Sequence, residues 1–178
     1  PETTIIFDML IFNYKYTYIY YYIIFSLVCQ EKKMLLIKFE DVLPLWELLH
    51  PGRKHKKYAQ MVYKDKNARW TLSEDELNIT FFGFYIKDKL CGVNSLHLTP
   101  NNLYRSRGLY VLPEYRCKGF GKLLLEQAIQ TAKNLGGDGI WSYPKDTAMS
   151  VYTNVGFIKD SEFEKADWGV NCYVIYRI

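Results

Sequence analysis

The stretch Tyr115-Arg116-Cys117-Lys118-Gly119-Phe120-Gly121-Lys122 is a short basic loop with two glycines, placed between a predicted strand and a predicted helix. The strand is 108–112, Gly-Leu-Tyr-Val-Leu, and it stops at Pro113. Apolar residues then recur at helical spacing until Gly136-Gly137 ends the pattern. These apolar residues are Leu124, Leu125, Ala128, Ile129, Ala132 and Leu135.

The two glycines give this loop the features of an anion site. Glycine lets the backbone approach a ligand closely, and the free N–H groups of the first helical turn attract negative charge. The loop therefore predicts a pyrophosphate cradle, with an ordinary strand-to-helix turn as the alternative. A dinucleotide fingerprint is excluded because Leu124 stands where its third glycine is needed. A Walker A loop is excluded by Arg116 and Leu123.

Composition favours one globular domain. The chain has 178 residues, of which 49% are hydrophobic, so its core can be large and the chain is not disordered by composition. The net charge of +4 is too small to indicate a nucleic-acid binder. Four scattered cysteines show no CxxC pair and no metal-ligand spacing, so we expect no metal site and a reducing, cytoplasmic setting.

Residues 1–33 differ from the rest of the chain. They are rich in Tyr and Ile, and Ile5 to Cys29 is long enough to span a bilayer, but Asp8, Asn13 and Lys15 interrupt it. We expect 1–33 to be an atypical extension outside the domain, with Met34 as the natural start; a membrane anchor is the alternative. The domain is then 34–178, with no membrane segment.

The remaining pattern predicts a mixed α/β domain. A basic loop, 50–57, and a hairpin turn, 87–89, separate some of its elements. The expected elements are strand 34–39, helix 40–49, helix 58–63, strands 79–86, 90–98 and 108–112, the helix after the glycine loop, strand 139–143, helix 146–155 capped by Asp146 and closed by Gly156, and strands 157–163 and 168–177.

Two motifs resemble those of the GNAT superfamily of acetyltransferases. Residues 116–121, Arg-Cys-Lys-Gly-Phe-Gly, are similar to its Arg/Gln-x-x-Gly-x-Gly/Ala motif, and 148–157 are similar to its Ala-x-x-x-Tyr-x-x-x-Gly-Phe helix. The likeness covers 34–178. It implies a mostly antiparallel central sheet of six to seven strands flanked by about four helices, and acetyl-CoA as the acetyl donor.

The resemblance also implies which residues bind the donor. The strand backbone lines the pantetheine arm and the loop holds the pyrophosphate, Cys117 through its N–H. Lys118 and Lys122 either add charge at the phosphates or are solvated surface lysines. The expected residues are Leu109, Tyr110, Val111, Arg116, Cys117, Lys118, Gly119, Phe120, Gly121 and Lys122.

For the chemistry, the resemblance implies that Tyr152 is the general acid toward the departing thiolate and that the Val111 N–H polarises the thioester carbonyl. His97, from its expected place on a cleft strand and its ordinary pKa, and Glu114, which follows the donor strand, are two candidate bases; a water chain to bulk solvent would need neither. The family often places Asn seven residues before the motif Tyr, and this chain has Lys145 there.

The expected acceptor is a primary amine of a small molecule or a protein. A non-catalytic acyl-CoA-binding module is the alternative, and no nucleic-acid partner is expected. The basic loop 50–57 and the acidic residues of 160–167 give opposite hints about the acceptor's charge. A monomer and a homodimer both remain open.

Overall fold

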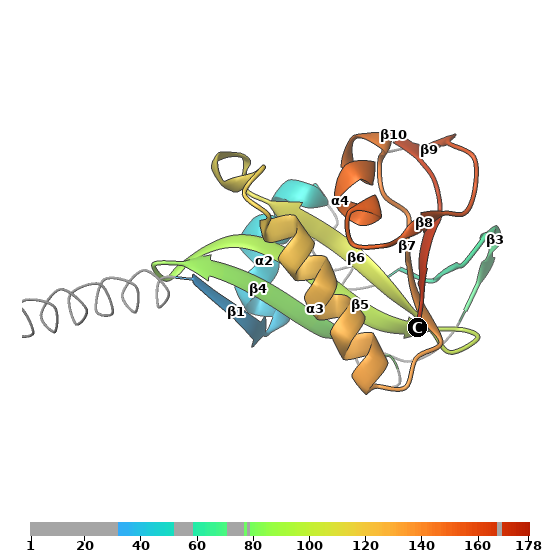
Figure 1. Cartoon of the computed structure of the whole chain (residues 1–178), viewed down its shortest axis with the longest axis horizontal. Coiled ribbons are helices and arrows are strands. Elements are labelled where there is room, and N and C mark those ends of the chain that lie inside the picture. The colour runs from blue at the N-terminus through green and yellow to red at the C-terminus, as the bar shows by residue number, and fades with distance from the viewer. Residues whose placement is uncertain (1–31, 52–58, 71–76, 78, 167–168) are drawn as a thin grey trace, which may run out of the picture.

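Seven strands of the computed structural model form one central sheet, with α2 against one face and α3 and α4 against the other (Figure 1). The structure describes residues 32–51, 59–70, 77, 79–166 and 169–178. The sheet order is β1-β4-β5-β6-β7-β11-β8. The strands are β1 Lys32–Ile37, β2 Met61–Val62, β3 Asp65–Arg69, β4 Thr80–Ile86, β5 Lys89–Thr99, β6 Leu103–Val111, β7 Gly139–Ser142, β8 Ile158–Lys159, β9 Glu164–Ala166, β10 Gly169–Asn171 and β11 Val174–Arg177. The helices are α2 Phe39–Leu49, α3 Phe120–Asn134 and α4 Met149–Thr153, with 3-10 turns η1 Pro113–Tyr115 and η2 Asp146–Ala148.

Most strand pairs are antiparallel, as expected. β1, β4, β5 and β6 pair in sequence order, and β11 pairs with both β7 and β8, all antiparallel. The exception is the parallel pair β6–β7 in the middle of the sheet. The chain between these two strands forms α3, because a parallel connection needs a crossover. The predicted fold class, a mixed α/β domain with a mostly antiparallel sheet of six to seven strands, is confirmed.

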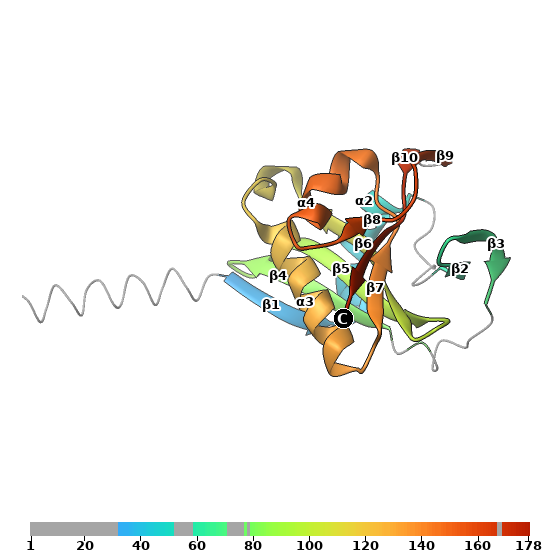
Figure 2. The same ribbon diagram turned by 45° about the vertical axis from the view of Figure 1, so that its right-hand side comes forward.

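Each face of the sheet has its own apolar core. Phe120 anchors the start of α3 in one core, where its ring stacks on Phe84 with centroids 4.4 Å apart. Trp46 of α2 anchors the other core against Phe81. Figure 2 shows α2 and α3 on opposite sides of β4 and β5. The glycine loop is thus fixed to the sheet by a buried ring at its helical end.

The helix that follows the glycine loop matches the expectation closely. Five of the six predicted apolar positions are buried along one face, whereas Leu135, which follows the last helical residue, is 42% exposed; Gly136, with φ of 72°, ends the segment. The hairpin at 87–89 is also confirmed: Lys87 and Asp88 both have positive φ, 47° and 61°, as a tight turn between strands requires.

The expectation of a helix at 58–63 is wrong over the described residues. Met61 and Val62 form β2, and the chain turns at Lys64, with φ of 59°, into β3. The turn presents the ring of Tyr63 to Trp141 and Tyr173, with centroids 5.4 and 5.6 Å away. Tertiary packing of an aromatic ring has outweighed a weak helical pattern.

Helix 146–155 and the last strands are also shorter than expected. The helix is divided into η2 and α4, and Asp146 accepts the N–H of Thr147 instead of capping α4. Gly156, with φ of 95°, does close the segment. Within 157–163 the strand is β8 alone, and the last segment is divided into β10 and β11. The described residues thus contain three α-helices where about four were expected.

At the N-terminal side, β1 begins at Lys32, two residues before the expected domain boundary. The rest of the expected extension, residues 1–31, and most of the basic loop, 52–57, lie outside the described residues. None of the helices within the described ranges is both long and apolar enough to cross a bilayer.

Candidate functional site

A bulge bends β6 in the middle of the sheet. Val93 pairs with Tyr110 and Ser95 pairs with Arg107, so Asn94 alone lies opposite Gly108 and Leu109. Gly108 has φ of 77°, and a Cβ there would lie 2.3 Å from the Trp46 ring. Only glycine fits both the backbone and the contact with α2.

β6 and β7 separate before the chain reaches the bulge. Their parallel pairing extends only from Leu103 to Arg105 on β6. Just after it, the Ser142 hydroxyl donates to the Ser106 carbonyl at 2.9 Å, and no described strand pairs with β6 on that side farther along. β6 therefore has an open backbone edge from Arg107 to Val111.

The N–H of Val111 points to this open edge. The N–H of the next residue, Leu112, donates to the carbonyl of Cys91 on the β5 side at 2.9 Å. Successive N–H groups along a strand point to opposite edges, so the Val111 N–H points away from β5. The structure thus orients the Val111 N–H, the predicted hydrogen-bond donor to the thioester carbonyl, toward the separation between β6 and β7.

The glycine loop lies where the open edge meets α3. Cys117 and Gly119 both have positive φ, 57° and 83°. Among the described residues no acceptor is found for the N–H groups of 117–122. A Cβ on Gly119 would meet nothing within 4 Å, so its open side is free for a ligand. Helix start and left-handed residues together form the concave N–H array that suits an anion.

The long side chains of the loop have protein partners. Arg116 Nε donates to the Val111 carbonyl at 2.9 Å, at the end of the open edge, and Lys118 Nζ donates to the Glu114 carbonyl at 2.9 Å. Lys122 lies 3.7 Å from Glu126, one helical turn on. The groups of this loop that have no protein partner among the described residues are therefore backbone N–H groups, that of Cys117 included.

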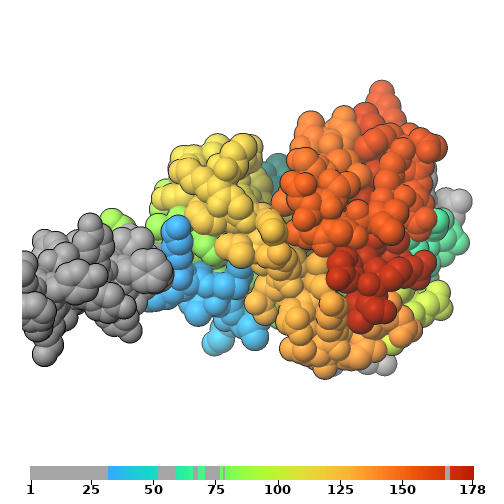
Figure 3. All heavy atoms as spheres, viewed as in Figure 1, coloured from blue at the N-terminus to red at the C-terminus, as the bar shows by residue number. Residues whose placement is uncertain are grey.

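Gly121 has a packing role. A Cβ there would lie 3.2 Å from Val151 of α4. α4 thus lies directly beside the start of α3, and Figures 1 and 2 both show it next to the glycine loop. Figure 3 shows a notch between the atoms of this loop and those of α4. The glycine loop, the start of α3 and the helix that carries Tyr152 therefore meet at one place.

Tyr152 is 4% exposed, and its hydroxyl lies at the point where β6 and β7 separate. Ser142 Oγ is 3.2 Å from this hydroxyl and 2.9 Å from the Ser106 carbonyl. Because a carbonyl can only accept, Ser142 donates to Ser106 and accepts from Tyr152. Ser106 in turn donates to Asn94. A satisfied buried network therefore holds the Tyr152 hydroxyl in place.

The environment of Tyr152 keeps its hydroxyl protonated. Burial raises its pKa above the usual 10.0, and hydrogen bonds with Ser142 and Ser106 and the nearby charge of Arg105 only partly oppose this. A neutral phenol is what a proton donor requires.

The two candidate bases lie in contrasting environments. His97 on β5 is 0% exposed, and burial, then the charges of Arg105 and Arg107, hold its pKa well below 6.5. Glu114 is exposed and lies 3.0 Å from Lys89, and a backbone hydrogen bond and this lysine lower its pKa. Both groups bind protons weakly at neutral pH.

Arg105 is a functional candidate that sequence reasoning missed. It is 7% exposed, lies on β6 opposite His97 of β5, and stacks on Trp141 with its Cζ 4.6 Å from the ring centroid. In the sequence it lies in the short polar run Arg105-Ser106-Arg107, which does not by itself indicate a buried face. Only the tertiary register shows that this face is covered.

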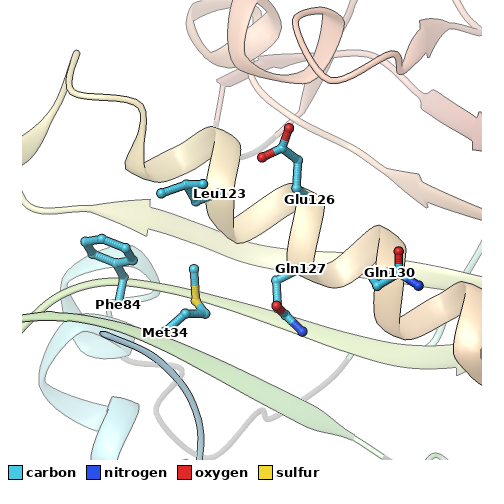
Figure 4. A pocket seen from close by; sticks show the side chains of 6 residues that line it. All are labelled: Met34, Phe84, Leu123, Glu126, Gln127 and Gln130. Atoms are coloured by element: carbon cyan, nitrogen blue, oxygen red, sulfur yellow. The ribbon is translucent and has the colours of Figure 1, made fainter. Parts of the chain in front are cut away.

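A second hollow lies on the other side of α3 (Figure 4). Met34, Phe84, Leu123, Glu126, Gln127 and Gln130 line this groove of about 330 Å³. It includes none of the predicted site residues, so it is separate from the candidate site. In the described part of the chain no cluster of His, Cys, Asp or Glu suits a metal ion.

Comparison with known proteins agrees with this geometry. A family model described as Acetyltransferase (GNAT) family matches residues 40–157. A comparison with curated protein sequences gives no match.

Solved structures with the same fold come from several bacteria. An IAA acetyltransferase from Bacillus cereus has a TM-score of 0.63 and 18% identity, covering 83% of this chain and 99% of its own. A Bacillus subtilis acetyltransferase in complex with CoA has a TM-score of 0.61 at 18% identity with the same coverage. A GNAT family acetyltransferase from Elizabethkingia anophelis with acetyl-CoA bound has a TM-score of 0.60 at 12% identity, again over 83% of this chain and 99% of that one.

Proposed function

Because this chain belongs to the GNAT family of acetyltransferases, we propose that it is an N-acetyltransferase that moves an acetyl group from acetyl-CoA to a primary amine. The observation that carries the proposal is the position of the Tyr152 hydroxyl, buried and protonated, where β6 and β7 separate. A module that only bound acyl-CoA would need the loop and the open edge but not this hydroxyl.

The residues present fit acetyl-CoA. The N–H groups of 117–122 and the open side of Gly119 would hold the pyrophosphate, and the β6 edge from Leu109 to Val111 would bind the amide groups of the pantetheine arm. Phe120 contributes through its N–H and through the anchoring of its ring. Acetyl-CoA supplies the acetyl group as a thioester.

The chain's own groups then support direct transfer in a ternary complex. The Val111 N–H is available to stabilise negative charge on the thioester oxygen as the amine attacks. The Tyr152 hydroxyl gives its proton to the leaving thiolate, and hydroxyl rotation lets the same proton turn from Ser142 toward the sulfur.

The proton released by the attacking amine leaves by solvent in this proposal. His97 is enclosed with a depressed pKa, and Glu114 is paired with Lys89, so both remain candidate bases of low proton affinity. A water path matches the open edge better and requires neither side chain.

The test is CoA release from acetyl-CoA by the full chain with a panel of primary amines. Turnover that depends on the amine supports the enzyme. Stabilisation by acetyl-CoA in a thermal melt without CoA release from any amine would instead indicate a binding module. Absence of both would refute the proposal.

A further inference from the structure

The guanidinium of Arg105 is buried, and no residue that the structure describes is an anionic partner for it. Its Nε and Nη1 are inaccessible and make no hydrogen bond, and no described carboxylate forms an ion pair with it. Burial lowers the pKa of Arg105 to about 10, so it is charged at neutral pH. A buried charge without a partner is costly, and functional sites are where such costs are retained.

The surroundings do not satisfy these donors. Trp141 offers its ring face 4.6 Å from Cζ, which attracts the charge but accepts none of the in-plane N–H bonds. Tyr173, 3% exposed, also has a buried hydroxyl without a hydrogen-bond partner in the described residues. Tyr173 and Arg105 both pack on Trp141, whose ring centroid lies 5.9 Å from the Tyr173 ring centroid and 4.6 Å from Arg105 Cζ, so the two groups lie close together.

One part of the guanidinium can be reached. Nη2 is not among the buried atoms and forms no hydrogen bond with described residues, and Arg105 retains 7% exposure. The accessible part of the guanidinium is therefore small, and the Trp141 ring lies against one of its faces. A planar anion with two acceptor oxygens matches a guanidinium fork in such a space.

The position of Arg105 indicates which of the two substrates the anion would belong to. Arg105 is the last residue of β6 that pairs with β7, and Ser106, which contacts the Tyr152 hydroxyl, follows it. Its side chain lies on the opposite face of the sheet from α3, where Leu103, Trp141 and Tyr173 pack. An anion here would sit on the far side of the reacting centre from the pyrophosphate cradle, and so would belong to the acceptor.

We propose that Arg105, with the Tyr173 hydroxyl, binds a carboxylate of the acceptor, so that the acceptor is an amine that also carries a carboxylate, such as a free amino acid. This inference rests on the proposed N-acetyltransferase function. It also gives the buried guanidinium a counter-charge, which no carboxylate in the described part of the chain supplies.

The test compares each amino acid with its carboxamide, for example alanine with alaninamide and phenylalanine with phenylalaninamide. The carboxamide has the less basic amine and so more free amine at neutral pH, which makes a preference for the acid attributable to binding. A comparison of phosphoethanolamine with ethanolamine tests in the same way whether the site binds a phosphate. The variants are Arg105→Met and, as a matched control, Arg107→Met, since Arg107 lies on the same strand and also stacks on a tryptophan, Trp46, at 4.9 Å.

We expect the native protein to prefer the carboxylate acceptors. Arg105→Met should lower kcat/KM for them by about 30-fold or more, mainly through KM. The same variant should change kcat/KM for the carboxamides less than about threefold, and Arg107→Met should keep the preference. The Tm of Arg105→Met should not fall, because the change removes an unpaired buried charge.

Each other outcome overturns the inference. If amino acids and their carboxamides are acetylated equally well, the carboxylate site is refuted while the proposed acetyltransferase activity stands. If phosphoethanolamine is preferred, the anion bound at Arg105 is a phosphate and not a carboxylate. A sharply lower Tm of Arg105→Met would show a structural arginine. If no amine releases CoA, the proposed acetyltransferase activity is refuted. A thermal melt in the presence of alanine then still tests the carboxylate site: the site requires that alanine raise the Tm of the native protein but not the Tm of Arg105→Met.

Discussion

Removal of one oxygen atom from Tyr152 is the sharpest perturbation of the proposed chemistry. In Tyr152→Phe the ring keeps its edge-to-face contact with Phe157, whose centroid is 5.3 Å away. Ser142 still donates to the Ser106 carbonyl at 2.9 Å, so no donor loses its acceptor. Because the Tyr152 hydroxyl has a single proton, which it donates to Ser142, the main loss is this one donated hydrogen bond, about 0.5–1.5 kcal/mol of the free energy of unfolding. For a domain of this size the Tm should fall by about 1–6 °C.

The effect on turnover should be far larger. General acid catalysis contributes about 10²- to 10⁴-fold, or about 3–5 kcal/mol of barrier, so kcat should fall by that factor. The Kd for acetyl-CoA should change less than about twofold, because the cradle and the β6 edge are unaltered. Since burial raises the pKa of Tyr152 above 10.0, the native enzyme should show no loss of kcat from its ionisation below that pH.

The measurements are CoA release at saturating amine, acetyl-CoA binding by calorimetry and a thermal melt on the same preparations. A kcat within threefold of the native value would refute the role of Tyr152. A parallel loss of acetyl-CoA affinity would show instead that the hydroxyl supports the binding site rather than the proton transfer.

Three further predictions concern the cradle, its anchor and pH. Gly119→Ala should cost about 1–2 kcal/mol of stability because φ is 83°, and it should weaken acetyl-CoA binding at least about tenfold. Gly136, with φ of 72° and equally free space around it, is the matched control: Gly136→Ala should cost the same stability and leave the affinity for acetyl-CoA unchanged. Phe120→Ala should lower the free energy of unfolding in urea by about 3–4 kcal/mol, while a change above about 1 kcal/mol in Leu123→Ala, 44% exposed, would contradict the assignment of the anchor. The pKa of His97 in the folded protein is held well below 6.5, so as the pH falls the unfolded chain takes up a proton at His97 before the folded protein does. The free energy of unfolding should therefore fall below about pH 6.5 by up to about 1.4 kcal/mol per pH unit. His97→Gln should lack this part of the pH dependence, and an identical pH dependence in both proteins would disprove it.

Much of the fold could be predicted from local pattern. The helix from Phe120 to Asn134 has a continuous apolar stripe and a glycine stop, and its limits were predictable because these signals are local. Segment 58–63 was mispredicted because Tyr63 gains its contacts from Trp141 and Tyr173, which are distant in sequence. The last strands were overestimated for a similar reason, since pairing partners and not propensity decide where β8 and β10 end.

The site divides in the same way. The glycine loop and Tyr152 lie in contiguous motifs, so their positions could be predicted, and the structure brings them together. Arg105 could not be predicted, because its significance depends on the parallel register with Trp141 and on the absence of a carboxylate among its described neighbours. His97 was chosen for its ordinary pKa, and its complete burial depends on the same register.

The short parallel pairing of β6 with β7 has a consequence for how the two substrates would be recognised. The open β6 edge presents main-chain groups, which nearly every amino acid at those positions supplies, whereas the acceptor side that we propose presents the side chains of Arg105 and Tyr173. Donor recognition is then encoded in backbone shape and acceptor recognition in side-chain identity. Substitutions on the face of the sheet that carries Arg105 can retarget the acceptor without disturbing the donor, so one scaffold can acquire new acceptors while its donor stays constant.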